Sequence, residues 1–574
     1  MRPFRKANTY PGILLILLFL LVSTAKAYNV NWSTIITAQT VRDMLSTAQG
    51  RQHALQFCSR LHVNKVYIEV FRDGYEADPD TLRTARDFFR RAGFEVSGAV
   101  ATTGIGKPST SWKIVACYTN QANQSRLAHI FRDAASVFNE IIIDDFFFTD
   151  CECSECAAAK GALSWRQYRK KLMLQVSRED VLGPARQMNP RVRVILKYPQ
   201  WYDKFQDRGY SVSAETRLYD RIWVGTELRD PSSERWGHKQ QYLGFFIYRW
   251  LHGIGGKKTG GAWFDPYGTS PNFYLDQAYV SVLAGAPEIL LFNLGDLDSA
   301  RYSRQVNALV SRESDLDGLS RFVGQWRGIP AYKPPSSDPG TEPDIFDQIG
   351  MLGIPLLPTS TFPAQARVAF FADYALTDVN FVPELVQFLQ RNGTAFVTED
   401  LAHRLNRDPR IAAFQNLELG EGEYSKSIGG GHGKIIVISD ALPRLTYVDS
   451  KDRVEQPDPA LRSALLSLRH IVENFAPTSL DAPPRVAVFP MGRQVAIMNF
   501  TELPVGCHLA YAGGPGTALR EVFSTPGASL AGDHQTLLLP PHGLVVVVPQ
   551  HSPVEATASV PLTAIKSWGA RSQF

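Results

Sequence analysis

The sequence has little net charge and no long basic block beyond its first residues. Its 574 residues include 60 Lys and Arg against 56 Asp and Glu, a formal net charge of +4. A nucleic acid or an anionic membrane surface needs a concentrated basic patch, so the composition predicts neither partner. With 44% hydrophobic and 20% charged residues, the composition is that of a globular protein, and the length predicts about two to four domains.

Several signatures of other enzyme classes are missing. The sequence contains no HExxH pair and no Ser/His/Asp order. The first clear strand, residues 65–70, is followed by Phe71-Arg72-Asp73-Gly74 rather than by a glycine-rich phosphate loop. A nucleotide-binding doubly wound sheet is therefore not expected.

Cysteine is scarce, with six residues in the chain, which excludes a disulfide-stapled scaffold. Cys151, Cys153 and Cys156 nevertheless form a C-x-C-x-x-C cluster. This spacing allows a thiolate site for a structural zinc ion, completed by a fourth ligand. A disulfide, for example with Cys117, and free thiols are the alternatives. We expect no cofactor to be required beyond this candidate zinc.

The N-terminus holds the one long apolar run. A basic start (Arg2 to Lys6) precedes the Leu/Ile-rich run 13–22, and residues 25–27, Ala-Lys-Ala, fit a cleavage site. We expect residues 1–27 to be a signal peptide and the protein to be secreted or periplasmic, with no membrane partner after cleavage. The alternative is a membrane anchor formed by the same segment if it stays uncleaved.

From residue 28 to residue 328, strand-like runs alternate with amphipathic helical stretches. The predicted strands are residues 65–70, 94–100, 113–117, 139–143, 191–198, 221–226, 261–265 and 288–293. Eight strands with helices in most of the gaps are typical of a (β/α)8 TIM barrel. The sequence therefore predicts this α/β fold for residues 28–328.

The rest of the chain divides into smaller parts. Residues 329–345, rich in Pro and Ser, are typical of a linker, and residues 346–445 alternate strands and helices as a small α/β domain does. A connecting helix is expected within 446–483. Between 484 and 550 short strands separated by turns predict a small antiparallel β-sandwich. Residues 551–574 form a loosely ordered tail.

The strand at 139–143 ends in two acids. Asp144 and Asp145 follow an apolar run and precede three phenylalanines. The carboxyl ends of barrel strands form the binding face of this fold, and adjacent buried charges are costly unless they are paired or used. A helix cap followed by a surface acid is the alternative. We predict a functional acid here, with only one of the two side chains pointing straight into the mouth.

Other strand ends supply candidate substrate-binding residues, with aromatic rings among charged and amide groups. They are Glu69, Arg72, Lys197, Tyr198, Trp201, Trp263, Tyr267 and Asn293. Aromatic faces stack on the C–H surfaces of sugars, and carboxylates supply acid, base or nucleophile, so the set predicts a carbohydrate site.

The predicted catalytic pair is Asp144, as nucleophile or charge stabiliser, and Glu227, as general acid/base. Asp145 and Asp265 are the substitutes. Glu227 has a structural alternative as an ion-pair partner of a neighbouring arginine. Asp265 has one as a turn-forming residue before proline.

The run from Ile141 to Phe148 resembles the strand-four motif of barrel glycoside hydrolases, in which an apolar strand ends in Asp-Asp followed by aromatics. By that resemblance Asp144 matches the nucleophile position of several retaining families. The three-part order is also similar to the family 42 β-galactosidases: a barrel, a glutamine-amidotransferase-like (flavodoxin-like) α/β domain and a small β domain.

The resemblance implies further expectations. Residues 383–401 look like the amidotransferase module but lack its nucleophilic cysteine, which implies a structural or homo-oligomerising role for this domain. Some family members carry a cysteine-bound zinc in the barrel, matching Cys151, Cys153 and Cys156. The family uses two glutamates on strands four and seven, where this chain has Asp144 or Asp145 and Asp265. β-Galactosidase activity is therefore not implied.

Three functions are compatible with these residues. The first is an exported glycoside hydrolase acting on an oligo- or polysaccharide through a carboxylate pair. The second is a non-catalytic carbohydrate-binding or scaffold protein that retains the barrel. The third is a sugar-modifying enzyme of another class that uses a metal at the cysteine cluster. We expect the first, with a carbohydrate as the partner.

Overall fold

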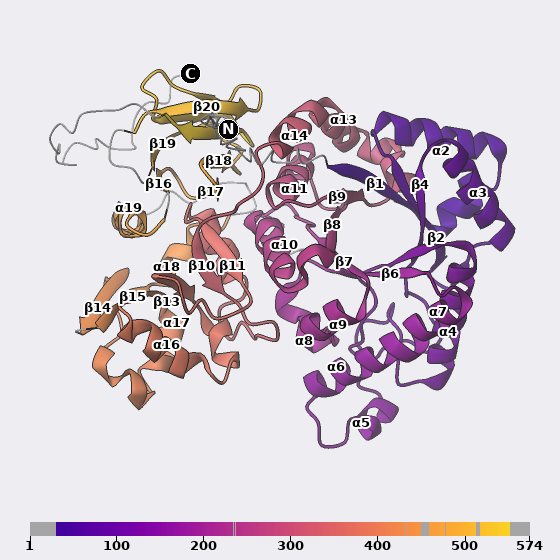
Figure 1. Ribbon diagram of the computed structural model, residues 1–574, viewed down its shortest axis with the longest axis horizontal. Helices are drawn as coiled ribbons and strands as arrows, with labels where there is room; N and C mark the ends of the chain where they lie inside the picture. The colour runs from indigo at the N-terminus through magenta and orange to yellow at the C-terminus, as the bar shows by residue number, and fades with distance from the viewer. Residues whose placement is uncertain are drawn as a thin grey trace, which may run out of the picture.

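The computed structural model describes residues 30–550 apart from Glu234, Trp236, Gly431, 449–458, Pro477 and 512–516. The predicted signal peptide and tail lie outside the described residues. Three parts follow one another along the chain: a barrel, an α/β domain and a β-sandwich (Figure 1). In the described part, no helix combines the length and apolar character that a membrane span requires.

Eight parallel strands form the barrel. They are β1 (Asn31–Ile36), β2 (Lys65–Arg72), β4 (Glu95–Val100), β5 (Glu140–Ile143), β6 (Arg193–Tyr198), β7 (Arg221–Gly225), β8 (Thr259–Phe264) and β9 (Glu288–Leu291). Each strand pairs with the next, and β1 pairs with both β9 and β2, so the sheet closes. The short β3 (Tyr75–Glu76) only extends β2. The closed ring confirms the predicted fold class.

One predicted barrel strand is wrong and another was missed. Residues 113–117 form a loop, in which Ile114 is exposed and Ala116 makes a single bridge to Pro108. The missing strand is β1, which escapes a search for apolar runs because Ser33 and Thr34 interrupt it. Their hydroxyls are satisfied inside the barrel wall, Ser33 by Glu288 and Thr34 by the Leu291 carbonyl, both at 2.8 Å.

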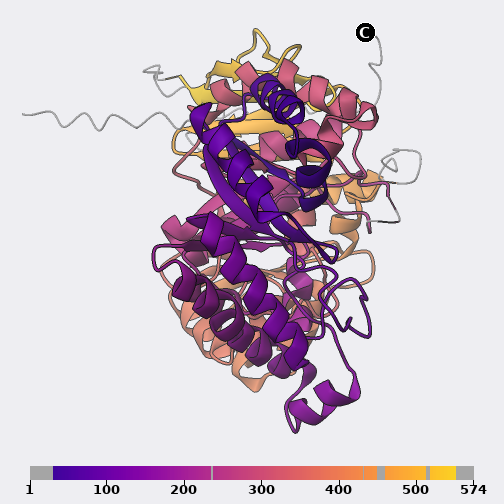
Figure 2. The same cartoon turned by 90° about the vertical axis from the view of Figure 1, so that its right-hand side faces the viewer.

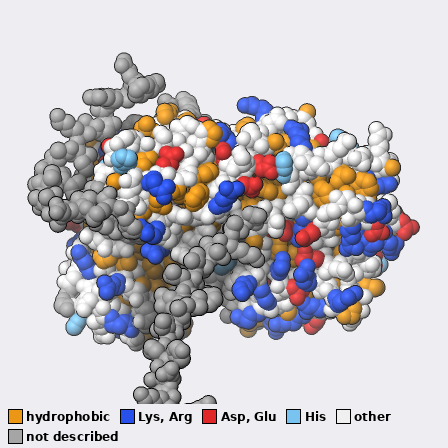
Figure 3. All heavy atoms as spheres, turned by 45° about the horizontal axis from the view of Figure 1, so that its top comes forward, with side chains coloured by type: hydrophobic (Ala, Val, Ile, Leu, Met, Phe, Trp, Pro, Cys, Tyr) orange, Lys and Arg blue, Asp and Glu red, His pale blue; other side chains and the backbone are white. Residues whose placement is uncertain are grey.

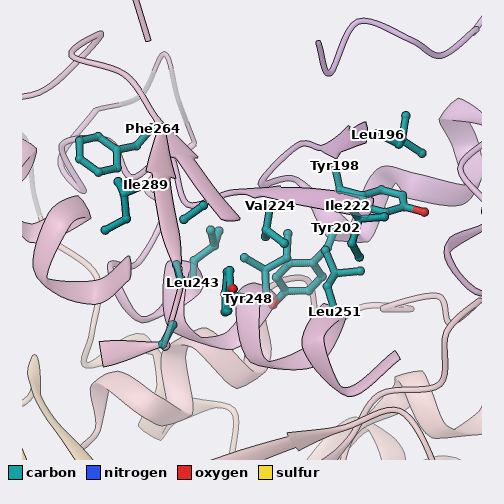
Figure 4. Packing of buried hydrophobic residues seen from close by; sticks show 14 of the residues in the cluster. Leu196, Tyr198, Tyr202, Ile222, Val224, Leu243, Tyr248, Leu251, Phe264 and Ile289 are labelled. Carbon is teal, nitrogen blue, oxygen red and sulfur yellow. The ribbon is translucent and has the colours of Figure 1, made fainter. Parts of the chain in front are cut away.

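Helices cover the outside of the barrel, as the view onto its wall shows (Figure 2). The longer ones are α2 (Ala48–Arg60), α3 (Pro79–Arg91), α4 (Gln121–Val137), α6 (Trp165–Val176), α10 (Tyr242–Gly255) and α11 (Pro271–Leu283). Polar caps begin several of them; Ser164 and Gln167, for example, form a capping box at α6. Outward-facing strand residues pack against these helices, as Val224 does near Leu243 and Leu251 of α10 (Figure 4).

Inward-facing side chains of the strands fill the inside of the barrel and form the bottom of the cavity at its mouth. One apolar layer crosses the interior: Ile35, Tyr67, Ala99, Ile142, Ile195, Trp223, Trp263 and Leu290. Because side chains alternate along a strand, residues two positions later point into the same space, nearer the carboxyl ends. By this rule Asp144, Lys197 and Asp265 lie directly above the apolar layer.

The α/β domain has a six-stranded sheet in the order β11-β10-β12-β13-β15-β14, parallel except for β14. Its strands are β10 (Ile329–Tyr332), β11 (Leu356–Thr359), β12 (Val368–Phe371), β13 (Thr394–Thr398), β14 (Ser425–Gly430) and β15 (His432–Ile438). Helices α16 (Phe381–Gln390) and α17 (Glu399–Leu405) pack on one face. On the other face, α15 (Ile345–Met351) contributes Phe346, which stacks on barrel residue Phe246 with ring centroids 5.2 Å apart.

The predicted linker at 329–345 is wrong at its start. Residues 329–332 are β10, an internal strand of the α/β sheet, in which Ile329 and Ala331 are fully buried. Proline at position 330 disguised the strand, whose residues Ile329 and Ala331 pack into one core and Tyr332 into another. The prolines that follow, at 334 and 335, leave the sheet as expected for a connecting segment.

Two antiparallel four-stranded sheets form the C-terminal sandwich, β16-β19-β22-β21 against β17-β18-β23-β20. Their strands are β16 (Thr478–Asp481), β17 (Val486–Met491), β18 (Gln494–Asn499), β19 (Val505–Tyr511), β20 (Leu519–Ser524), β21 (Ser529–Leu530), β22 (Thr536–Leu539) and β23 (Leu544–Pro549). The predicted connecting helix is α19 (Pro459–Glu473). Phe489 of β17 turns away from the sandwich core and stacks on Tyr242 of the barrel helix α10.

Charges of both signs mix on the molecular surface. On the face shown in Figure 3, Lys and Arg side chains lie beside Asp and Glu side chains, with apolar groups between them. A strong field of one sign is not seen on this face, in keeping with the formal net charge of +4.

Candidate active site

A cavity of about 720 Å³ opens at the carboxyl ends of the barrel strands. This is where ligands bind in the (β/α)8 fold. Ten of the twelve residues predicted for catalysis or substrate binding line it: Arg72, Asp144, Asp145, Lys197, Trp201, Glu227, Trp263, Asp265, Tyr267 and Asn293. The volume falls within the ~300–1,000 Å³ typical of ligand sites.

Asp144 is held by an arginine that is itself held by a second acid. Arg72 donates to both oxygens of Glu69, at 2.8 and 3.0 Å, and to Asp144 Oδ2. The other oxygen of Asp144 accepts the Asp145 backbone N–H at 2.6 Å. Burial opposes ionisation of Asp144, but the charges of Arg72 and Lys197 and the hydrogen bonds to the carboxylate together keep the pKa of this carboxyl below its ordinary value.

A lysine joins two further carboxyls. Lys197 Nζ lies 2.8 Å from Asp145 Oδ2 and 2.5 Å from Glu227 Oε1, and we call these three residues the mouth trio. Lys197 also lies over the face of Trp263, 4.5 Å from the ring centroid. Within the described residues, Glu227 Oε2 has no hydrogen-bond partner, and the Asp145 carboxyl has, besides Lys197, only the neighbouring carboxyl of Asp144. Both side chains line the cavity.

The two carboxyls of the mouth trio are close together, and the pKa of Asp145 is shifted. Because both contact one ammonium, their nearest oxygens are separated by no more than the two contact distances laid end to end. Burial raises the pKa of Asp145 well above its ordinary value, and the negative charges of Asp144 and Glu227 add to this against the opposing effect of Lys197.

Asp265 is more fully engaged than the mouth trio. Arg229 donates to its Oδ2 and the backbone N–H of Tyr267 to its Oδ1, both at 2.9 Å. The second contact is the turn that the sequence Asp265-Pro266 had offered as an alternative. Burial and the neighbouring Glu227 raise the pKa of Asp265 to about 6, against the opposing charge of Arg229.

Amide and phenol groups complete the opposite side of the cavity. Asn293 donates to Asp296 Oδ2 at 2.8 Å and to the Tyr267 hydroxyl at 3.1 Å, and the Tyr267 hydroxyl also donates to Asp296. All three line the cavity. Such a fixed polar cluster is suited to binding hydroxyl groups.

Two predicted binding residues do not reach the cavity. Tyr198 points outward from β6 and is fully buried, and its hydroxyl donates to Glu215 at 3.1 Å (Figure 4). This corrects its predicted place in the site, and the reason is alternation, since Lys197 next to it points inward. Glu69 is also fully buried and acts through Arg72 rather than by lining the cavity.

Several cavity residues were not predicted. They are Thr37, Gln39, Thr40, Trp112, Phe146, Phe148, Gln200, Arg235, Lys239, Phe292, Gly295 and Asp296. Phe146 and Phe148 directly follow the two aspartates, so their position was a usable signal. Trp112 lies in the loop misread as a strand. Lys239 comes from the long loop after β7, and it contacts Asp344 of the α/β domain, which no local pattern indicates.

Four cysteines gather beside the mouth. The described thiols are all free, and the Sγ atom of Cys117 lies 3.5 Å from that of Cys156 and 3.8 Å from that of Cys153. The sulfurs of Cys117, Cys151, Cys153 and Cys156 all lie within 4.8 Å of one another. Zn–S bonds of ~2.3 Å in a tetrahedron place sulfurs ~3.8 Å apart, so the four thiols fit a zinc ion. Cys117, predicted as a disulfide partner, is placed as the fourth thiol.

Comparison with known proteins gives a family match. The chain matches the model of a probable glycosyl hydrolase, catalytic domain, over residues 21–312, just over half of its length. It is also 26% identical over 356 residues, 56% of the chain, to an uncharacterized protein of Saccharolobus solfataricus. That match spans 58% of the relative's own length.

Solved structures share the whole three-part layout. An α-L-fucosidase isoenzyme 2 from Paenibacillus thiaminolyticus superposes with a TM-score of 0.60 and 11% identity, covering 92% of this chain and 100% of that one. A GH42 β-galactosidase from G. stearothermophilus gives 0.59 and 13%, covering 92% and 99%. At these identities the likeness establishes the fold, and it confirms the resemblance seen in the sequence.

Proposed function

The chain belongs to the probable glycosyl hydrolases through its catalytic domain, and from this premise we propose that it hydrolyses glycosidic bonds of an oligo- or polysaccharide. We propose Asp145 and Glu227 as the catalytic carboxyls. One observation carries this choice: Lys197 contacts one oxygen of each, and both side chains line the cavity with no second cationic partner among the described residues.

The spacing of this pair supports a retaining mechanism. Retaining glycosidases hold their carboxyl groups ~5–5.5 Å apart, whereas inverting enzymes leave ~6.5–9.5 Å for a water molecule. The shared contact with Lys197 keeps the nearest oxygens of Asp145 and Glu227 closer together than the inverting range. The two carboxyls would then flank the scissile bond, with Lys197 in contact with both.

The charges assign the two roles. The mouth trio holds two carboxyls against one ammonium, and the ionised Asp144 lies beside it. A proton on Asp145 relieves this excess of negative charge, in the direction of its raised pKa. Asp145 is thus the general acid that protonates the departing glycosidic oxygen, while Glu227 attacks the anomeric carbon. Asp145 then takes a proton from water, which releases the sugar from Glu227.

This choice makes Glu227 the nucleophile in place of Asp144, which the sequence predicted. Asp144 has both oxygens engaged, by Arg72 and by a backbone N–H, which suits a residue that fixes local charge and geometry. Asp265 is similarly engaged by Arg229 and its own turn. We therefore give Asp144 the charge-stabilising role, the second of the two considered from sequence, and Asp265 a positioning role.

The test is a screen of the purified protein against aryl glycosides and polysaccharides, with an Asp145→Asn/Glu227→Gln double variant as control. We expect turnover of at least one substrate by the wild type and none by the folded control. A wild-type protein that binds glycans and turns over none of them would favour the non-catalytic carbohydrate-binding alternative.

We further propose that Cys117, Cys151, Cys153 and Cys156 hold a structural zinc ion. The support is the spacing of their sulfurs and their position between the loops that carry Trp112 and Phe148. Metal analysis of the purified protein is expected to give one zinc per chain, lowered in Cys117→Ser. Equal zinc content in both proteins would contradict this proposal.

Export is also proposed, on the sequence of residues 1–27 alone. N-terminal sequencing of protein recovered outside the cytoplasm is expected to begin at Tyr28. A mature chain that still begins at Met1 would favour the anchored alternative. Association of chains through the α/β domain stays a prediction.

A further inference from the structure

A second hollow of about 400 Å³ lies beside the main cavity. Thr110 and Ser111 line it from one loop, Asp150 and Glu152 from another, and Lys204 and Arg208 from the segment after β6. The same three segments continue into the main cavity through Trp112, Phe148 and Trp201. The two hollows therefore share a wall, and by volume the second falls within the ~300–1,000 Å³ range of ligand sites.

Trp112 lines the main cavity and directly follows Ser111, which lines the second hollow. Its side chain is 41% exposed, although burial of a large apolar side chain is favourable. It packs on Phe146 and Phe148, with ring centroids 5.7 and 5.5 Å away, and the guanidinium of Arg208 lies 5.9 Å from its ring centroid. An exposed aromatic ring held in one orientation at a cavity rim is suited to stacking on a sugar.

Buried ion pairs hold the second hollow open. Asp150 is 5% exposed and accepts hydrogen bonds from Ser109, from Arg208 and from the backbone N–H of Trp112, the last at 3.2 Å. Arg169 is also buried and donates to Glu152 at 2.7 Å and to the Asp150 carbonyl at 3.2 Å. The polar wall is therefore formed before any ligand arrives, which lowers the cost of binding.

The charges in this hollow balance. Three of its lining residues are cationic and three are acidic. A sugar carrying a carboxylate or sulfate would meet as many repulsive as attractive charges, while neutral hydroxyl groups find both donors and acceptors. The chemistry of the wall thus fits an uncharged glycosyl unit.

We propose that this hollow is a second glycosyl-binding subsite, taking a neutral sugar unit that is linked across Trp112 to the unit cleaved in the main cavity. The inference rests on the proposed hydrolase function and specifies its substrate class, a neutral di- or longer oligosaccharide. Binding energy gained in the second hollow then raises kcat/KM for oligosaccharides above that for aryl monoglycosides.

The test blocks the hollow without touching the main cavity. Ser111 is exposed and lines the hollow, so Ser111→Trp fills it, while Lys113→Trp adds the same bulk to the same loop outside both cavities. The readout is the ratio of kcat/KM for a neutral oligosaccharide to kcat/KM for an aryl monoglycoside. We expect Ser111→Trp to lower this ratio about tenfold, and Lys113→Trp to keep it within about twofold.

An unchanged ratio in Ser111→Trp, or an equal fall in both variants, would overturn the subsite. Should Ser111→Trp not fold, Lys204→Ala trims the exposed wall instead, and a smaller fall in the same ratio is expected. Failure of the hydrolase proposal is separate, because it appears as no turnover of either substrate by the wild type.

Binding to the folded Glu227→Gln variant gives a readout that needs no turnover. Its affinity for neutral oligosaccharides is expected to rise with one added sugar unit and to exceed that for a uronate-containing analogue of the same length. Equal or stronger binding of the charged analogue would contradict a neutral subsite.

Discussion

The two ends of the barrel carry similar groups in different surroundings. At the bottom, Lys65 Nζ lies 2.8 Å from Glu140 and 3.1 Å from Glu288, an arrangement we call the bottom trio. It has the composition of the mouth trio, one lysine between two carboxyls. The bottom trio, however, lines neither of the two cavities described above.

The bottom trio differs from the mouth trio in its additional hydrogen bonds. At the bottom, Ser97 donates to Glu140 at 2.9 Å, and Ser33 and Tyr67 each donate to Glu288 at 2.8 Å. Burial opposes ionisation of Glu140, but Lys65, Ser97 and Arg193 together lower the pKa of Glu140, whereas the pKa of Asp145 is raised. A buried charged cluster that lines neither cavity is structural, while carboxyls that line a cavity are available for chemistry.

The largest expected difference is in Glu227→Gln. The variant removes the proposed nucleophile and keeps its size, so kcat/KM should fall more than about 10⁴-fold, the scale of a lost nucleophile. The measurement is turnover of the best aryl glycoside, with the thermal melting point as the control for folding. Activity within about tenfold of wild type would remove Glu227 from the mechanism.

Asp145→Asn should be the next most damaging change. Loss of general acid catalysis costs about 10²–10⁴-fold in kcat, and less for substrates whose leaving group needs no proton. The wild type should lose activity as the pH rises through the raised pKa of Asp145, and the variant should lack that loss. A larger loss in Asp144→Asn than in Asp145→Asn would instead restore Asp144 as the nucleophile.

The bottom trio should respond in stability and not in catalysis. Lys65→Met removes the ammonium shared by two buried carboxylates and leaves Glu288 with hydroxyl partners only, which is expected to lower the free energy of unfolding by about 3–5 kcal/mol. In protein that remains folded, kcat should match the wild type. The matched variant Lys197→Met tests the mouth, where we expect kcat to fall. Loss of kcat in folded Lys65→Met would contradict a purely structural role for the bottom trio.

The smallest effect concerns Asp265. Its pKa is raised from 3.8 to about 6 on folding, so the folded protein holds a proton that the unfolded chain has lost. This contribution to stability is full below about pH 4 and is lost as the pH rises through about 6, worth up to about 3 kcal/mol. Asp265→Asn should flatten the dependence of the melting temperature on pH between these values. An unchanged slope would show that Asp265 is not its source.

Local sequence patterns predicted much of the barrel and many residues of the main cavity. Asp144, Lys197 and Glu227 end apolar strands, and a closed ring brings such ends together whatever lies between them. The same rule, applied with alternation, would have placed Tyr198 outside. β1 was missed because it contains a serine and a threonine. Ser33 is buried in the barrel wall by its hydrogen bond to Glu288, which lies 255 residues away in the sequence.

The details of the candidate site depend on contacts between residues that are far apart in the sequence. Cys117 completes the thiol cluster only because the loop before α4 lies against the loop after β5. The choice between Asp144 and Asp145 depends on Arg72 from β2 and Lys197 from β6. The balance of charges in the second hollow likewise depends on three separate segments.

Covalent trapping tests the central claim most directly. A slow-leaving fluorinated derivative of a cleaved aryl glycoside would be incubated with the protein, and the labelled peptide would be identified by mass spectrometry. The account predicts one glycosyl group attached to Glu227, with the label lost in Glu227→Gln. A label on Asp144 or Asp265, or product of inverted configuration with no label, would contradict it.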